Sequence, residues 1–195
     1  MNLTKPPKLK PGDKIAAVSL SWGGAGNSDI RWRYDLGVSR LISEFGLEAV
    51  AMTHSLKGED YVRDHPEDRA EDLMIAFADP SIKGIIANIG GNDSIRLFHY
   101  IDFNIIRNNP KVLIGYSDII NVHLMCYKAG LATFYGANLL TTIADPQGIH
   151  PYSRYWFQKS LFDNQPIGNI APSDEFTCDE TEYRHEAQLI WMMDL

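Results

Sequence analysis

Short apolar runs alternate with amphipathic segments along most of this chain. The runs have the length of buried strands, and the segments between them repeat apolar residues at helical spacing. The expected strands are 14–20, 47–52, 83–89, 111–115 and 131–135; the expected helices are 30–45, 66–78, 94–100, 104–108 and a segment from Ser117 to Gly130. Alternating strands and helices build parallel pairs, because a crossover helix returns the chain to the same edge. The pattern predicts an α/β fold with a doubly wound, mostly parallel sheet and helices on both faces.

The alternation ends near residue 150. Residues 152–162 keep a helical spacing, whereas 163–186 are polar and acidic and contain two prolines. The polar segment 53–65 is expected to be a loop. We therefore expect an α/β domain over residues 1–162, a linker over 163–186, and over 187–195 the start of a C-terminal domain that is otherwise missing, with one strand at 187–193.

Composition narrows the function classes. The 195 residues are 45% hydrophobic and can bury one good core. The net charge of -7, without any basic run, argues against a nucleic-acid partner, because phosphate binding needs clustered Lys and Arg. No apolar run approaches the roughly 20 residues of a membrane helix, and the N-terminus lacks the apolar core of a signal peptide. We expect a cytoplasmic protein with a small-molecule or peptide partner and no membrane.

Ser117 is placed between a strand and a helix. The apolar run 111–115 ends at a glycine, and apolar residues at helical spacing follow the serine. Such a corner holds a hydroxyl at the carboxyl edge of a sheet, where the helix N-terminus favours negative charge. However, Ile119 replaces the last glycine of the G-x-S-x-G elbow, and serine is also a common helix N-cap. The local pattern alone favours the cap over a nucleophile.

A second motif, Gly90-Gly91-Asn92-Asp93, follows the neighbouring expected strand. Glycine lets backbone N–H groups approach a ligand closely or form an oxyanion hole. The alternative is a tight turn in which asparagine and aspartate serve turn chemistry. Two such motifs at strand ends of one sheet favour a site, with Ser117 as nucleophile and Gly90, Asn92 and Asp93 as substrate-binding residues.

Other polar motifs are weaker. The glycine-rich loop 19–26 lacks the spacing of a nucleotide-binding loop and is expected to form a flexible pocket rim. His123 is expected to be structural, and the two cysteines, Cys126 and Cys178, are expected to be free thiols. His185 with Glu182 and Glu186 could form a base and its orienting group, although a solvated charge cluster is favoured. The remaining histidines are expected on the surface or in loops: His54, His65, His99 and His150.

The ordered motifs resemble those of one known family. They are Leu9–Lys14, Ala76–Pro80, Asn88–Ser94, Tyr100–Phe103, Ile106–Lys111 and Ile114–Asp118. Over nearly its whole length the chain resembles the N-terminal domain of the LD-carboxypeptidase family of serine peptidases. Within that family it is most similar to the microcin C immunity branch.

The resemblance implies a flavodoxin-like or class I glutamine amidotransferase-like domain. It implies Ser117 as the nucleophile, with the backbone N–H groups of Asp118 and Gly91 as the oxyanion hole. It also implies a cytoplasmic homodimer that uses no metal or cofactor. Family members hydrolyse an amide next to a free carboxylate, either in murein peptides or in the peptidyl-nucleotide of processed microcin C.

One part of the family pattern has no counterpart here. The family triad is Ser-Glu-His, and its glutamate and histidine come from a C-terminal domain. No residue of this chain matches either one. A serine hydroxyl needs a neighbouring base, so we expect the 195 residues alone to be inactive. The alternative is a non-catalytic binding or dimerisation module derived from the family.

Overall fold

The computed structural model describes residues 3–176 and 192–193. Its central sheet is parallel throughout, and the strand order is β2-β1-β3-β4-β5. The strands are β1 (Lys14–Val18), β2 (Glu48–Ala51), β3 (Ile82–Ala87), β4 (Val112–Gly115) and β5 (Phe134–Tyr135). The α/β fold and the parallel sheet are therefore confirmed. This flavodoxin-like order reverses direction between β1 and β3, where ligands of such sheets bind.

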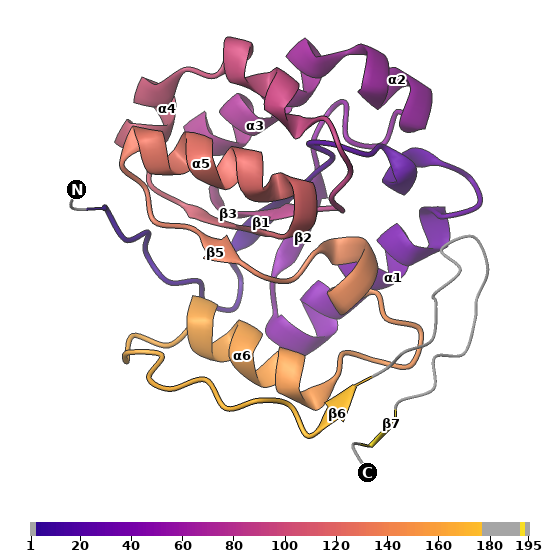
Figure 1. The fold of residues 1–195 in the computed structure, drawn as a ribbon, viewed down its shortest axis with the longest axis vertical. Helices are drawn as coiled ribbons and strands as arrows, with labels where there is room; N and C mark the ends of the chain where they lie inside the picture. The colour runs from indigo at the N-terminus through magenta and orange to yellow at the C-terminus, as the bar shows by residue number, and fades with distance from the viewer. Residues whose placement is uncertain (1–2, 177–191, 194–195) are drawn as a thin grey trace.

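Helices cover both faces of the sheet (Figure 1). The α-helices are α1 (Arg31–Phe45), α2 (Glu59–Asp64), α3 (Pro66–Ala78), α4 (Phe103–Asn108), α5 (Ile120–Ala129) and α6 (Pro151–Leu161). Short helical turns are η1 (Gly24–Gly26), η2 (Ser94–Tyr100), η3 (Ser117–Ile119) and η4 (Leu139–Ile143). Helices α3, α4 and α5 pack on one face, and α1 and α6 lie beyond the other face.

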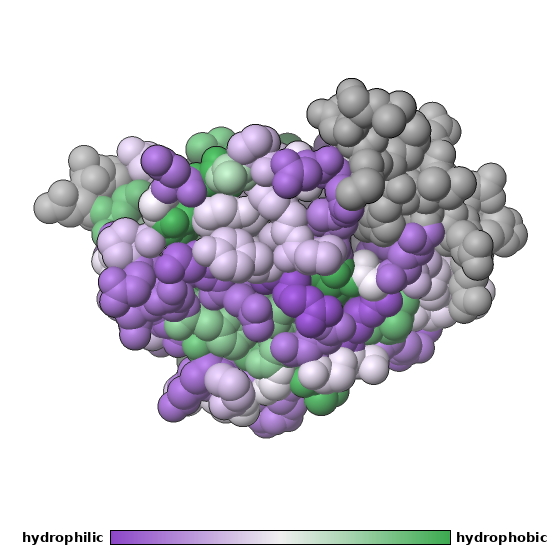
Figure 2. Space-filling view, turned by 90° about the horizontal axis from the view of Figure 1, so that it is seen from below, coloured by the Kyte–Doolittle hydropathy of each residue, from purple (hydrophilic) through white to green (hydrophobic). Residues whose placement is uncertain are grey.

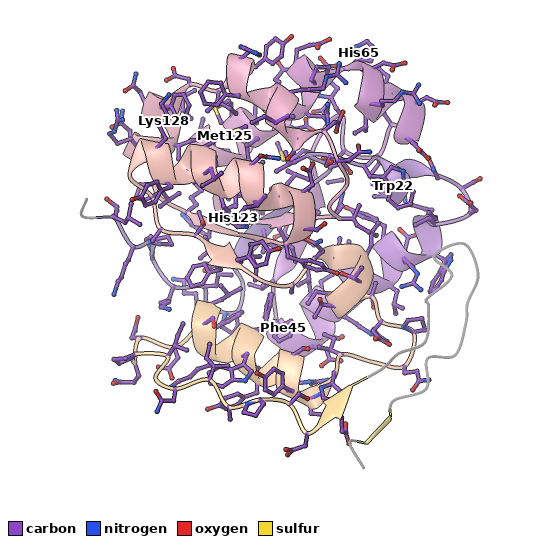
Figure 3. The ribbon with its side chains drawn as sticks, in the orientation of Figure 1. Trp22, Phe45, His65, His123, Met125 and Lys128 are labelled. Atoms are coloured by element: carbon purple, nitrogen blue, oxygen red, sulfur yellow. The ribbon has the colours of Figure 1, made fainter. Side chains whose placement is uncertain are left out.

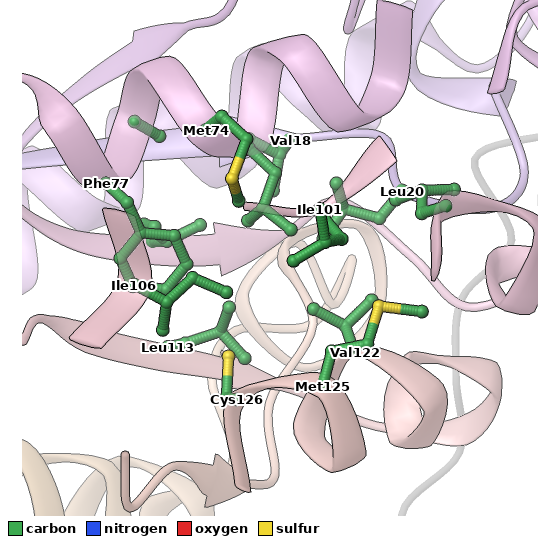
Figure 4. Packing of buried hydrophobic residues seen from close by; sticks show 14 of the residues in the cluster. Val18, Leu20, Met74, Phe77, Ile101, Ile106, Leu113, Val122, Met125 and Cys126 are labelled. Atoms are coloured by element: carbon green, nitrogen blue, oxygen red, sulfur yellow. The ribbon is translucent and has the colours of Figure 1, made fainter. Parts of the chain in front are cut away.

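Two apolar layers follow from the two-residue period of the strands. In β1, Ala16 and Val18 pack with α3 and α5, whereas Ile15 and Ala17 pack with α1 and α6. Figure 4 shows the first layer, in which side chains of α3 and α5 meet over the sheet. Because both faces of the sheet are covered at its centre, residues 15–18 of β1 and all of β4 are buried apolar runs, as the sequence predicted, whereas the edge strand β2 has no buried residue.

Glycines end two helices at the expected positions. Gly46 follows α1 with φ 66°, and Gly130 follows α5 with φ 90°. These left-handed conformations are ordinary for glycine and let the next backbone N–H groups reach the last helical carbonyls. The C-terminal ends of both helices were thus predicted from the sequence, whereas α5 begins only at Ile120, after the turn η3.

The expected loop 53–65 was partly wrong, because it contains helix α2. This helix has only six residues, and Val62 is its buried residue. So short a segment shows no helical period, and its only sequence signal is the acidic first turn, Glu59 and Asp60. Strand β5 is also shorter than expected, because Leu131 forms only an isolated bridge with Thr4.

Beyond α6 the chain runs along the face that Figure 2 shows, which is largely hydrophilic with small apolar patches. Strand β6 (Glu175–Phe176) pairs antiparallel with β7 (Met192–Met193). Most of the expected strand at 187–193 and part of the linker lie outside the described residues, so the predicted domain boundaries stay predictions. Within the part of the chain that the structure describes, no helix is long and apolar enough to cross a membrane.

Candidate active site

The loops after β1, β3 and β4 meet at the carboxyl edge of the sheet. They line a cavity of ≈ 280 Å³, whose walls are Trp22, Ile89, Gly90, Gly91, Tyr116, Ser117 and Asn138. Trp22 comes from the loop after β1, and Figure 3 shows it at this end of the molecule. The strand order makes this convergence possible, because β1, β3 and β4 are direct neighbours. The structure therefore brings Ser117 and the Gly90-Gly91 loop into one cavity.

Ser117 has an unusual backbone conformation. Its φ is 64°, and among the described residues it is the only non-glycine with a positive φ. For an L-residue this left-handed conformation costs roughly 1–2 kcal/mol. Ser117 begins η3, Tyr116 precedes that turn as its cap residue, and no side-chain cap hydrogen bond is formed. The helix-cap interpretation is therefore wrong, and Ser117 stands on a strained strand-to-helix corner, as nucleophiles of serine hydrolases do.

Residues distant in sequence hold this corner. The Ser117 backbone N–H donates to the Tyr135 hydroxyl at 3.0 Å, and the Tyr116 N–H donates to Asn138 Oδ1 at 3.1 Å. Asn138 is 1% exposed, and its Nδ2 has no hydrogen-bond partner among the described residues. Neither Tyr135 nor Asn138 could be predicted from the sequence, because neither belongs to a recognisable motif and both reach the site only through the fold.

The Gly90-Gly91 loop lies directly against the serine. A methyl group built on Gly90 would come within 2.7 Å of Ser117 Cβ, 2.9 Å of its Oγ and 3.3 Å of Asp118 N. Gly91 has φ 154°, and a methyl group there would meet Trp22 N at 2.8 Å. Only glycines fit this close approach. The loop therefore lies where backbone N–H groups could face negative charge that develops on a substrate bound beside Ser117. The role of the Gly91 and Asp118 N–H groups as an oxyanion hole stays a prediction.

The Asp118 carboxylate joins the three loops. It accepts hydrogen bonds from Ser21 Oγ at 2.7 Å, from the Ser94 N–H at 2.7 Å and from Asn121 Nδ2 at 2.9 Å. Burial alone would raise its pKa, but the hydrogen bonds from Ser21 and Ser94 outweigh burial and lower the pKa. An ionised Asp118 thus fixes the backbone that carries the predicted oxyanion-hole N–H.

Asp93 belongs to an ion pair that the sequence did not reveal. Arg69 of α3 is 1% exposed and donates to both Asp93 oxygens, at 2.8 and 3.1 Å. The same guanidinium donates to the carbonyls of Leu20 and Ser21, each at 3.3 Å. The Arg69–Asp93 pair therefore connects the Gly90-Gly91 loop to α3 and to the loop after β1, whereas the predicted contact of Asp93 with substrate stays a prediction. Asn92 is exposed and lines an adjoining cavity of ≈ 410 Å³.

The histidines occupy different settings. His123 is buried, donates through Nε2 to the Gly115 carbonyl at 2.9 Å and bonds Thr133 Oγ1 through Nδ1 at 2.8 Å. Burial lowers the pKa of His123, so it is neutral and structural, as expected. His150 directly precedes α6 and is 11% exposed, and His54 is 16% exposed, so both loop histidines are more buried than expected. His185, with its two glutamates, lies outside the described residues.

Neither a histidine nor a carboxylate within residues 3–176 and 192–193 hydrogen-bonds Ser117 Oγ. The free thiol Cys126 is no substitute nucleophile, because it is buried and burial raises its pKa to about 12. Cys178 lies outside the described residues. The described part of the chain thus supplies a strained hydroxyl and a cradle of backbone groups, while a base has to come from elsewhere.

Replacing Gly90 by alanine is expected to disable the site with little unfolding. The new methyl group must displace Ser117 or the Asp118 N–H, because it would approach within 2.7 Å of the serine. Loss of one oxyanion donor lowers turnover by about 10²–10³-fold in serine hydrolases. The rate of acylation by a fluorophosphonate tests this, measured on a protein in which this chain is joined to a C-terminal domain of the family (the full-length protein). The matched control is Gly136→Ala, where a methyl group would meet only Ile114, at 3.7 Å, and the rate should hold.

This chain is similar to known proteins over much of its length. Residues 15–136 match the family described as LD-carboxypeptidase N-terminal domain. The "Probable murein peptide carboxypeptidase" of Bacillus subtilis is 31% identical over 160 residues, which are 81% of this chain and 47% of the relative. The microcin C7 self-immunity protein MccF of Escherichia coli is 37% identical over 144 residues, 73% of this chain and 40% of MccF.

A solved structure has the same fold. The MccF-like protein from Streptococcus pneumoniae, crystallised in complex with AMP, superposes with a TM-score of 0.82 at 35% identity. The match covers 93% of this chain and 55% of that protein. The chain thus spans about half the length of the relatives it matches. From the family match and the shared fold it follows that the chain belongs to the LD-carboxypeptidase family and contains its N-terminal domain.

Proposed function

We propose that this chain is the nucleophile-bearing part of a serine carboxypeptidase of the LD-carboxypeptidase type. Its substrate is an amide next to a free carboxylate, in a murein peptide or a peptidyl-nucleotide. The protein acts as a cytoplasmic homodimer. The observation that carries this proposal is the positive φ of Ser117 in a cavity lined by Gly90 and Gly91. Backbone strain of this kind clusters at active sites, ligand clamps and switch regions.

In the proposed reaction, Ser117 Oγ attacks the scissile carbonyl carbon while a base takes its proton. The carbonyl oxygen gains the negative charge, and the N–H groups of Asp118 and Gly91 stabilise it. The intermediate then expels the amine, which receives the proton from the conjugate acid of the base. Water hydrolyses the resulting ester of Ser117 and frees the acid product. The base and its orienting acid are the family's histidine and glutamate, which lie beyond the matched domain.

Two relatives support the substrate classes. One is named for murein peptides and one for immunity to microcin C7, and the MccF-like structure holds AMP. Trp22 lines the serine cavity and provides an aromatic surface on which the nucleobase of a peptidyl-nucleotide, or another planar group, could stack. The similarity of Asn88–Ser94 to the immunity branch favours the peptidyl-nucleotide.

A fluorophosphonate probe is the test of the nucleophile. In the full-length protein that carries this chain, the probe is expected to attach to Ser117, and peptide mass spectrometry identifies the site. Ser117→Ala should abolish the adduct. The 195-residue chain, whose described residues place no base on Ser117 Oγ, is expected to react more slowly by several orders of magnitude. Labelling elsewhere with Ser117 unmodified would reject the assignment.

A second candidate is a non-catalytic binding or dimerisation module. It is favoured by one observation, the lack of a base on Ser117 Oγ among the described residues. Calorimetry of the 195-residue chain with AMP and with a murein tetrapeptide separates the two proposals. Binding without turnover in the full-length protein would favour the module, whereas turnover there would favour the peptidase.

A further inference from the structure

A histidine and two carboxylates meet beside the carboxyl end of β2. His54 lies in the loop after that strand, and Asp68 and Glu71 lie about one turn apart on α3. One ligand atom from each residue lies within 4.8 Å of the other two. His54 Nε2 is 3.9 Å from Asp68 Oδ2, and its Nδ1 is 3.9 Å from Glu71 Oε2. None of the three lines the cavity of Ser117.

A fourth carboxylate orients the imidazole. Asp72 is 2% exposed and lies 3.0 Å from His54 Nδ1, and it also accepts from the His54 N–H and from Ser55 Oγ, both at 3.0 Å. Because Asp72 is the acceptor, Nδ1 carries the proton and Nε2 keeps its lone pair. A carboxylate that holds the far nitrogen in this way is the usual outer partner of a histidine bound to a metal. This partner lies outside the three candidate ligands and fixes the ring before any ligand arrives.

The cluster has an excess of negative charge. The described donors to Asp72 are a peptide N–H, a hydroxyl and an imidazole, none of which is a permanent cation. Arg69, on the same helix, has its charge committed to Asp93. A cation on His54 would balance these carboxylates.

We propose that His54 Nε2, Asp68 and Glu71 bind a divalent transition metal ion of the zinc type. Imidazole with carboxylates suits zinc, and three protein ligands leave a fourth position for water. Bonds of about 2.0–2.2 Å bring tetrahedral ligand atoms to about 3.4 Å, so the 3.9 Å gap between His54 and Asp68 closes by a small rotation. Glu71 is 59% exposed and free to turn inward. The Tyr61 hydroxyl already donates to Asp68 and orients that carboxylate.

Zinc titration of the 195-residue chain by calorimetry tests the site. The titration uses a Cys178→Ser/His185→Ala background, because these two side chains could also bind zinc. One ion per chain is expected, and Asp68→Asn and Glu71→Gln should each weaken binding at least tenfold. Asp72→Asn, which removes only the orienting partner, should weaken it by about 10–100-fold.

Two matched controls sharpen the test. Glu67→Gln removes a carboxylate from the same first turn of α3, and His65→Ala removes a neighbouring exposed histidine; neither should change zinc affinity. Thermal melts without zinc verify that each variant is folded. If Asp68→Asn fails to fold, the test rests on Glu71→Gln, because the Glu71 side chain is exposed and its substitution should not disturb the fold. An absence of zinc binding, or binding that Glu71→Gln leaves unchanged, overturns the proposal.

Discussion

Replacing Ser117 by glycine is expected to abolish hydrolysis and, at the same time, to stabilise the fold. Serine at φ 64° carries strain of roughly 1–2 kcal/mol that glycine does not. Part of this gain is lost because glycine makes the unfolded chain more flexible. The net increase in the free energy of unfolding is about 0.5–1 kcal/mol. Without the attacking oxygen, turnover in the full-length protein should fall by about 10⁴-fold or more.

Urea unfolding of the 195-residue chain measures the gain in stability, and hydrolysis assays on the full-length protein measure the loss of activity. Ser117→Ala is the matched control, because it removes the same oxygen and keeps the strain. Both variants should be inactive, but only the glycine variant should be more stable. If Ser117→Gly were no more stable than Ser117→Ala, the conformation would be unstrained and would lose its value as evidence for a nucleophile.

The opposite signs follow from one geometric fact. If replacing a residue stabilises the fold, the original residue serves a purpose other than folding stability. The Ser117 N–H donates to Tyr135 at 3.0 Å, and the Tyr116 N–H donates to buried Asn138. These bonds hold the corner in its strained shape. Stability data alone can therefore separate a functional serine from one that merely fills a turn.

The sequence predicted the fold well because the central strands of the sheet are largely buried on both faces. A strand such as β4 must be apolar at every position, and the glycine that follows α5 marks the helix end without reference to the rest of the chain. The corner at Ser117 was visible for the same reason, since strand, serine and helix are contiguous. Local chemistry is enough for such features.

The supports of the site were not visible, because they depend on contacts between distant segments. Arg69 reads as one more charged residue on α3, and nothing near it in sequence announces that Asp93 is its partner. Asn138 likewise reaches Tyr116 only after β5 has been placed beside β4. In a parallel sheet, the neighbours of a loop come from other crossovers, so single-sequence patterns miss them.

Replacing Arg69 by methionine is expected to destabilise the chain by about 3 kcal/mol, the lower end for breaking a buried pair. The lower end applies because Asp93, the abandoned partner, is 23% exposed and regains some water. The carbonyls of Leu20 and Ser21 also lose their donor. The free energy of unfolding in urea, followed by circular dichroism, is the measurement.

Arg96 offers a matched control for this substitution. It bonds the same carboxylate at 3.2 Å but is 46% exposed, so Arg96→Met should cost less than about 1 kcal/mol. Asp93→Asn added to Arg69→Met should recover part of the loss, because the uncompensated charge is then gone. An equal loss in the free energy of unfolding for the two arginine variants would refute the conclusion that the buried Arg69–Asp93 pair connects α3 to the Gly90-Gly91 loop. A larger loss of stability for Arg69→Met than for Arg96→Met, together with slower labelling of Ser117 in the full-length Arg69→Met protein, would have a further meaning. It would show that the Arg69–Asp93 pair also positions the loop against the serine.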